Sequence, residues 1–184
     1  MSGGRPASTS GSPSGAVQIG HVPAPPQLRA FAEGAEAACR RLVVGGLVHD
    51  GAGRLFVQRR SEDRALYPGC WDVVGGHAEA GEGVLEALRR EIEEETGWRL
   101  ASVGEVVEIL DWEAGAEAKR EIDLLVTVQG DLGAPRLERG KHTAARWLTA
   151  DELPLLLERR DPDDVFIHDI VRRAFVLLGL HQDR

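Results

Sequence analysis

The chain has 184 residues, of which 42% are hydrophobic and 28% charged, so it is long and apolar enough for one packed domain. Its formal net charge of -8 argues against non-specific binding to nucleic acid polymers or to anionic membranes. Its two cysteines are too few for a disulfide scaffold, and no apolar run reaches the roughly 18 residues of a membrane span. We therefore expect a soluble, cytoplasmic, single-domain protein.

The first 27 residues contain five of the nine prolines, together with five glycines and five serines. Such a segment cannot bury enough apolar surface to offset the entropy lost on ordering. We expect residues 1–27 to be a disordered tail. Residues 28–40 are predicted to form a linker or a short helix, because Leu28, Phe31 and Ala35 recur at helical spacing.

Strand and helix patterns alternate from Arg41 onward. Two β-rich runs joined by a turn predict an antiparallel hairpin over Arg41–Arg60. A short apolar strand follows at Trp71–Val74, and then a helix from about Gly83 to Thr96. Gly97 stands where a helix needs a left-handed residue at its end.

The second half of the chain predicts three strands and two helices. The strands lie near 102–112, 121–129 and 144–148, with an acidic loop between the first two, and the helices near 150–158 and 164–178. Thr149 and Asp163 are the expected helix caps. Pro154 weakens the first of these helices, because proline removes a backbone hydrogen bond. One mixed α/β domain is predicted over residues 41–180.

The helix predicted at 83–96 carries three glutamates on one face. Glu91, Glu94 and Glu95 share an arc, because residues three and four positions apart are neighbours on a helix. Carboxylates so close repel one another, and a hard cation such as Mg²⁺ or Mn²⁺ would relieve the repulsion. A solvated charged face is the competing interpretation, since charge runs usually face water.

The spacing of the surrounding segment favours the metal site. Five residues separate Gly76 from Glu82, and seven more lead to the run from Arg90 to Gly97. This pattern matches the Nudix box, G-x5-E-x7-R-E-U-x-E-E-x-G-U, where U is a bulky apolar residue. The chain therefore resembles the Nudix hydrolase superfamily, and its MutT-related members in particular. Trp98 occupies the last position, where an aliphatic residue is usual, and we expect only a packing adjustment there.

The resemblance implies a Nudix fold over residues 41–180, an α/β (α+β) domain in which a mixed β-sheet is sandwiched between helices. It also implies a divalent metal, Mg²⁺ or Mn²⁺. Glu91, Glu94 and Glu95 become metal ligands by this correspondence, and the backbone carbonyl of Gly75 would bind the same metal.

The other box residues take supporting roles in the same correspondence. Arg90 would serve catalysis by orienting a box glutamate through charge-assisted hydrogen bonds. Glu82 would brace the loop and the helix start, while Gly76 and Gly97 would form structural turns.

The box does not assign the general base. In MutT-type relatives a further glutamate lies a few residues before a late Trp, which here would be Trp147. Lys141 stands at about that place, so Glu138, His142 and a box glutamate are the alternatives.

Two further positions are candidates for substrate contact. Arg59 and Arg60 match a place where the family often carries basic residues, although charges on an edge strand also prevent aggregation. His77 could face substrate, but a surface-loop histidine is the more ordinary interpretation.

The resemblance implies a hydrolase that cleaves the diphosphate linkage of a nucleoside diphosphate derivative, for example a nucleoside triphosphate to monophosphate and pyrophosphate. An isopentenyl-diphosphate-isomerase-like enzyme is one alternative, although its catalytic cysteine position corresponds to Gly75. A non-catalytic nucleotide-sensing module is the other. Dimerisation is common in the family, and no residue pattern here proves it.

Overall fold

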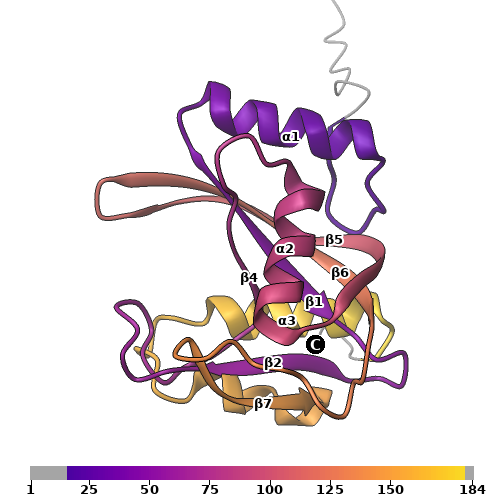
Figure 1. Ribbon diagram of the computed structural model, residues 1–184, viewed down its shortest axis with the longest axis vertical. Helices are drawn as coiled ribbons and strands as arrows, with labels where there is room; N and C mark the ends of the chain where they lie inside the picture. The colour runs from indigo at the N-terminus through magenta and orange to yellow at the C-terminus, as the bar shows by residue number, and fades with distance from the viewer. Residues whose placement is uncertain (1–15, 181–184) are drawn as a thin grey trace, which may run out of the picture.

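The computed structural model describes residues 16–180 and contains two β-sheets with helices on their outer faces (Figure 1). The first sheet is mixed and has the strand order β4 (Val74–His77), β1 (Arg41–Val48), β6 (Glu117–Gln129), β5 (Arg99–Ala114). The second is antiparallel, with the order β3 (Trp71–Asp72), β2 (Leu55–Arg60), β7 (His142–Leu148). The helices are α1 (Pro25–Ala37), α2 (Val84–Thr96), the 3₁₀ helix η1 (Ala150–Leu157) and α3 (Phe166–Leu177). The predicted mixed sheet between helices is confirmed, and the second sheet is an addition to it.

The predicted hairpin over Arg41–Arg60 is wrong. Its two strands lie in different sheets and are joined only by a bridge between His49 and Leu55. Strand β1 pairs in parallel with β6 on one edge and antiparallel with β4 on the other. Because both edges of β1 are occupied, β2 cannot pair along it and instead pairs with β7.

The boundary of the predicted tail also changes. Residues 1–15 lie outside the described part of the chain, but residues 16–27 are structured. Ile19 forms a bridge with Val106 of β5, and α1 begins at Pro25. Proline suits the first turn of a helix, where its missing N–H would have no intrahelical partner. Helix α1 therefore starts three residues before the linker segment predicted at 28–40.

Helix α2 forms as predicted and packs on one face of the mixed sheet. It ends at Thr96, and Gly97 follows with a φ of 72°, the left-handed conformation that its position requires. Leu88 and Ile92 pack into the same core as Leu42 and Val44 of β1. This packing holds the glutamate-bearing face of α2 against the edge of the sheet at β4.

The other face of the sheet is covered by η1 and α3. Leu153 and Leu156 of η1 share a core with Ile170 and Phe175 of α3. Helix η1 begins after Thr149 as predicted, and its 3₁₀ geometry accommodates Pro154. The predicted cap at Asp163 is wrong, because Val165 precedes the first residue of α3.

Strands β5 and β6 form a longer hairpin than the sequence predicted. The acidic segment expected to be a loop continues both strands as far as Ala114 and Glu117, and the hairpin projects from the body of the molecule (Figure 1). Among the described residues, no helix is long and apolar enough to cross a membrane.

A buried acid lies in the middle of the mixed sheet. Asp123 of β6 is fully buried and sits opposite Gly45 of β1, where a Cβ would come within 1.8 Å of its Oδ1. Neither carboxylate oxygen has a hydrogen-bond partner among the described residues. Burial, followed by repulsion from Glu121 and Glu108, raises the pKa of Asp123 well above its usual range.

This raised pKa predicts a pH-dependent stability. An acid that binds protons more tightly when folded stabilises the fold below its unfolded pKa, and that contribution is lost as the pH rises through its folded pKa. We expect Asp123→Asn to flatten the fall in the free energy of unfolding above pH ~4, by up to about 1.4 kcal/mol per pH unit. Urea titrations at a series of pH values measure the free energy of unfolding of both proteins.

The exposed Asp163→Asn is the matched control and should leave the pH profile as it is in the wild type. An unchanged profile in Asp123→Asn would show that Asp123 ionises normally.

Candidate active site

The glutamates of helix α2 differ in burial according to the side of the helix on which they lie. Glu91 and Glu95, one turn apart, are 7% and 5% exposed, whereas Glu93 and Glu94 are exposed. The helix therefore buries two of the three predicted ligands and leaves the third at its rim.

Glu95 is held by two groups from other elements and lies near a third. Its Oε2 accepts hydrogen bonds from the backbone N–H of Gly75 at 3.1 Å and from Nε2 of Gln58 at 2.5 Å. Its Oε1 lies 3.7 Å from Nε2 of His142. Sequence reasoning missed Gln58, although a glutamine within the apolar run of β2 was a usable signal of a polar group turned inward.

Glu91 is packed against strand β4 at Gly76, so the structural turn predicted at Gly76 is wrong. A Cβ on Gly76 would come within 2.5 Å of Oε1 of Glu91, so only glycine leaves room for this carboxylate. A Cβ on Gly75 would meet the carbonyl oxygen of Val44 at 2.3 Å. Gly75 and Gly76 thus allow the close approach between β4, β1 and α2.

Arg90 links the box together. Its Nε and Nη2 donate to the two carboxylate oxygens of Glu82, each at 2.9 Å. Its Nη1 donates to Glu91 at 2.8 Å and to Glu94 at 3.2 Å, and Nη2 also reaches the carbonyl of His77 at 2.9 Å. Hydrogen bonding to Glu82 is the largest cause that raises the pKa of Arg90.

The buried acids resist ionisation. Burial raises the pKa of Glu95 to about 8, and repulsion from Glu91 adds to the effect of burial. Burial likewise raises the pKa of Glu91, partly offset by the hydrogen bond from Arg90. Two neighbouring carboxylates in this state would be stabilised as anions by a cation.

The donor set suits a hard divalent cation. Carboxylates and backbone carbonyls are the oxygen ligands that Mg²⁺ and Mn²⁺ prefer. Within residues 16–180, no three acidic, histidine or cysteine side chains are already grouped to hold one ion. The third predicted ligand, Glu94, has a side chain that is 46% exposed, and Arg90 joins it to Glu91.

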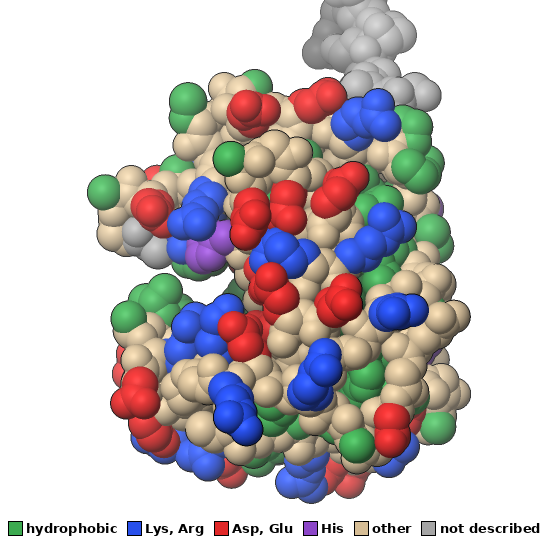
Figure 2. Space-filling view, viewed as in Figure 1, with side chains coloured by type: hydrophobic (Ala, Val, Ile, Leu, Met, Phe, Trp, Pro, Cys, Tyr) green, Lys and Arg blue, Asp and Glu red, His purple; other side chains and the backbone are tan. Residues whose placement is uncertain are grey.

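A cavity of about 560 Å³ opens beside these acids, and the space-filling surface is hollowed where acidic and basic side chains gather (Figure 2). Gly75, Glu91 and Glu95 line one part of it. Basic side chains also line it, namely Arg41, Arg60, Arg64, Arg90, Lys119, Lys141 and Arg160. This combination suits an anionic ligand that approaches the acids together with a cation.

The lining of the cavity includes some of the residues predicted for substrate contact or for the general base and leaves out others. Arg60 lines it and bonds to Asp72 at 3.1 Å. Arg59 is not among its lining residues, and its Nε donates to the carbonyl of Gly69. Glu138 does not line the cavity. It forms an ion pair at 2.9 Å with Lys141, which does.

Two histidines are placed differently from expectation. His142 does not line the cavity but lies buried behind Glu95. The predicted surface-loop position of His77 is wrong, because His77 belongs to β4 and lines the cavity. Burial lowers the pKa of each histidine to about 4, so both are neutral at pH 7.

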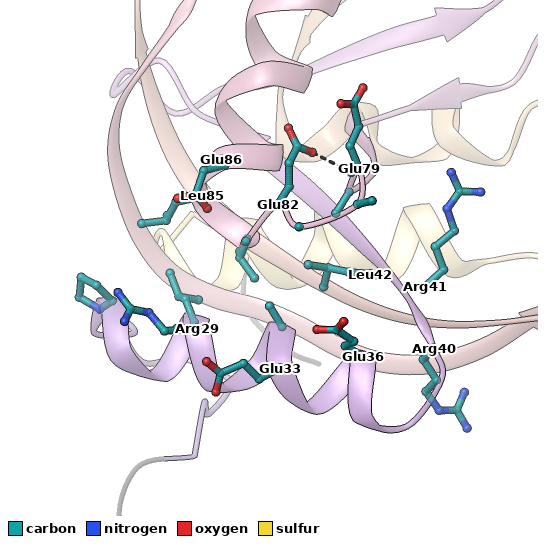
Figure 3. Close-up of a pocket in the computed structure, with 18 residues that line it drawn as sticks. Arg29, Glu33, Glu36, Arg40, Arg41, Leu42, Glu79, Glu82, Leu85 and Glu86 are labelled. Carbon is teal, nitrogen blue, oxygen red and sulfur yellow. Dashed lines mark hydrogen bonds between the residues drawn. The ribbon is translucent and has the colours of Figure 1, made fainter.

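A second hollow, of about 830 Å³, lies between α1 and the loop that leads into α2 (Figure 3). Glu33 and Glu36 of α1 line one side of this hollow and Glu79 and Glu82 of the loop line the other, and the Glu79 N–H donates to Glu82 at 2.8 Å. Because none of the three predicted metal-binding glutamates lines this hollow, we place the chemistry in the first cavity.

Trp98 accounts for the departure at the end of the box. It is 2% exposed, and its ring packs edge-on to Phe56 at 4.7 Å and stacks with Trp147 at 5.7 Å. Its Nε1 donates to the carbonyl of Asp131 at 2.9 Å. The expected packing adjustment is confirmed as a buried aromatic cluster.

Comparison with known proteins gives a consistent result. The NUDIX domain family matches residues 39–170. An uncharacterized Nudix hydrolase of Yersinia pestis is 50% identical over 52 residues, which cover 28% of this chain and 29% of that relative. The match therefore spans less than a third of the relative's length.

Solved structures extend the likeness over the whole domain. A MutT NUDIX hydrolase from Burkholderia pseudomallei is 26% identical with a TM-score of 0.55, covering 73% of this chain and 97% of that one. A MutT protein from Methanosarcina mazei has a TM-score of 0.58 at 22% identity, covering 77% and 96% of the two chains.

The contacts of Glu95 predict a role for Gln58 in metal affinity. Replacing Gln58 by leucine removes one of the two hydrogen bonds to Oε2 of Glu95, so the carboxylate loses its fixed orientation. We expect Gln58→Leu to weaken Mn²⁺ binding by about 10- to 100-fold, as for other groups that orient metal ligands. Electron paramagnetic resonance of free Mn²⁺ measures the change.

Gln129→Leu, the same substitution at an exposed strand end, is the control and should bind Mn²⁺ as the wild type does. If Gln58→Leu kept its circular dichroism spectrum and its full Mn²⁺ affinity, the orienting role would be wrong.

Proposed function

Since the chain belongs to the NUDIX family, we propose that it is a divalent-metal-dependent pyrophosphohydrolase of nucleoside diphosphate derivatives. Cleavage of a nucleoside triphosphate to a monophosphate and pyrophosphate is one such reaction. The observation that carries the proposal is the pair of buried carboxylates, Glu91 and Glu95, that opens onto a cavity lined with basic side chains.

The three box glutamates and the Gly75 carbonyl would hold the metal, with Mg²⁺ as the proposed ion and Mn²⁺ as its substitute. When bound, such an ion neutralises phosphate charge and lowers the pKa of water. Arg90 positions two of the glutamates, since a single Nη1 contacts both Glu91 and Glu94.

The basic lining would bind the phosphates. Arg60, Arg64 and Lys141 lie along the same cavity as Glu91 and Glu95, so an anionic chain can be held at several points. Multiple contacts fix the position of the reacting phosphorus relative to the acids. The substrate is then held in the orientation that the reaction needs.

The reaction adds one water across a phosphoanhydride bond. The water oxygen forms a bond to one phosphorus, the bridging P–O bond breaks, and the leaving phosphate departs with the bridging oxygen. The proton released from water passes to a box carboxylate. Glu91 and Glu95 line the cavity beside the proposed metal, so either carboxylate is placed to accept this proton.

Glu94→Gln tests the proposal. The protein would be incubated with Mg²⁺ and a panel of canonical and oxidised nucleoside triphosphates, ADP-ribose, dinucleoside polyphosphates and sugar nucleotides, and the products analysed by mass spectrometry. We expect a monophosphate product from the wild type and a loss of about 100-fold or more in kcat for Glu94→Gln. Reaction in ¹⁸O-labelled water identifies the attacked phosphorus.

Glu93→Gln is the matched control, because Glu93 is the exposed neighbour of Glu94 on the same helix and should retain full activity. Equal rates for both variants, or no turnover of any compound by the wild type, would contradict the proposal.

A further inference from the structure

The same cavity has a second polar wall away from the box glutamates. Trp112 of β5 and Lys119 of β6 are register partners, and Leu110 and Glu121 are the next pair on the same face. Trp112, Lys119 and Glu121 all line the cavity. The β5–β6 hairpin therefore supplies an aromatic ring and a carboxylate to a space whose other part contains the acids of α2.

Glu121 is buried, being 8% exposed, and only one of its oxygens is used within the protein. Oε2 accepts a hydrogen bond from Nε1 of Trp112 at 2.6 Å. Among the described residues, no hydrogen bond reaches Oε1. Because Glu121 lines the cavity, Oε1 is available to accept a hydrogen bond from a group bound there.

The ammonium group of Lys119 contacts groups other than Oε1 of Glu121. Its Nζ lies 4.6 Å from the centre of the Trp112 ring and 3.8 Å from Oε2 of Glu117. The lysine is thus held by the ring and by a different carboxylate. This arrangement supports Trp112 on one side and leaves Glu121 facing the cavity.

The next acid along β6, Asp123, does not line the cavity. Asp123 is fully buried on the same face of β6, and both of its oxygens lack partners among the described residues. Gly45 of β1 makes room for its carboxylate, since a Cβ there would come within 1.8 Å of Oδ1 of Asp123. The acceptor that this wall offers to the cavity is therefore Glu121, and a ligand that donates a hydrogen bond complements it.

We propose that Glu121 is a specificity-determining residue whose Oε1 accepts a hydrogen bond from an N–H group of a nitrogen heterocycle lying beside Trp112. The inference rests on the proposed function, in which the diphosphate lies at the α2 acids and the nucleoside extends toward the hairpin. A planar ring matches the indole surface, and N–H donors on its edge match the carboxylate.

Removal of one donor from the ligand tests this assignment without any hydrolysis. Calorimetry would compare four pairs of nucleoside 5′-monophosphates that differ in a single donor: GMP and IMP, AMP and purine riboside monophosphate, CMP and its 4-deamino analogue, UMP and N3-methyl-UMP. For the tightest-binding base, we expect the wild type to lose about 10-fold or more in affinity when its donor is removed.

Glu121→Gln should abolish this discrimination while retaining the size of the side chain. When the glutamine carbonyl oxygen accepts from Nε1 of Trp112, the amide NH2 group takes the place of the oxygen that faces the ligand. It presents a donor to the donor of the ligand, so the member with the donor loses its advantage. Glu113→Gln, at an exposed position on β5, is the control and should discriminate as the wild type does. Thermal melts check that both variants are folded.

The outcomes separate this inference from the proposed function. A donor penalty that persists in folded Glu121→Gln, or monophosphates that bind without any preference or not at all, would overturn the role of Glu121. Turnover of the matching triphosphates with Mg²⁺ is measured separately. If binding depended on the donor and on Glu121 but no triphosphate were hydrolysed, the role of Glu121 would be supported and the proposed hydrolase activity would be contradicted.

Discussion

The burial of Glu91 and Glu95 is the constraint on which the rest of the site depends. Two neighbouring carboxylates removed from water are unstable as anions unless hydrogen bonds and positive charge compensate them. Gly76 leaves room for the first, Arg90 bonds to it, and the Gly75 N–H bonds to the second. The compensation is incomplete, as the raised pKa of both acids shows, and this deficit is what a bound cation would fill.

Groups from both sheets compensate the buried charge of Glu95. Strand β4 supplies the backbone at Gly75, β2 of the other sheet supplies Gln58, and both converge on Glu95 of α2. The aromatic cluster of Phe56, Trp98 and Trp147 fastens the end of α2 to β2 and β7. The acids are therefore held by rigid elements, which suits a site that must keep its geometry as ligands come and go.

The cavity divides its chemistry between two walls of the same molecule. Acids and arginines near α2 suit an anionic chain with a cation, whereas Trp112 and Glu121 on the hairpin suit a flat ring with donors. Val43 and Gly45 of β1 line the cavity between the two walls, since β1 pairs with β4 on one edge and with β6 on the other. With this division, the residues of the hairpin can change the preference for the heterocycle while the acids of α2, which contact the anionic chain, stay the same.

Sequence reasoning reached the local features and missed those set by long-range pairing. The extent of α2, the cap at Gly97 and the shared face of the glutamates follow from helical periodicity and spacing, which are local properties. The separation of β1 and β2 into two sheets depends on which distant strands occupy their edges, and no local pattern encodes that. For the same reason Gln58 and Glu121 escaped notice, since their partners are contributed by other strands or helices.

The most direct test of the metal-binding role of α2 is anomalous diffraction from crystals grown with Mn²⁺. The account predicts an anomalous peak within bonding distance of the carboxylates of Glu91, Glu94 and Glu95 and of the Gly75 carbonyl. A peak elsewhere, for example beside Glu121 and Asp123, or no peak at saturating Mn²⁺, would contradict it.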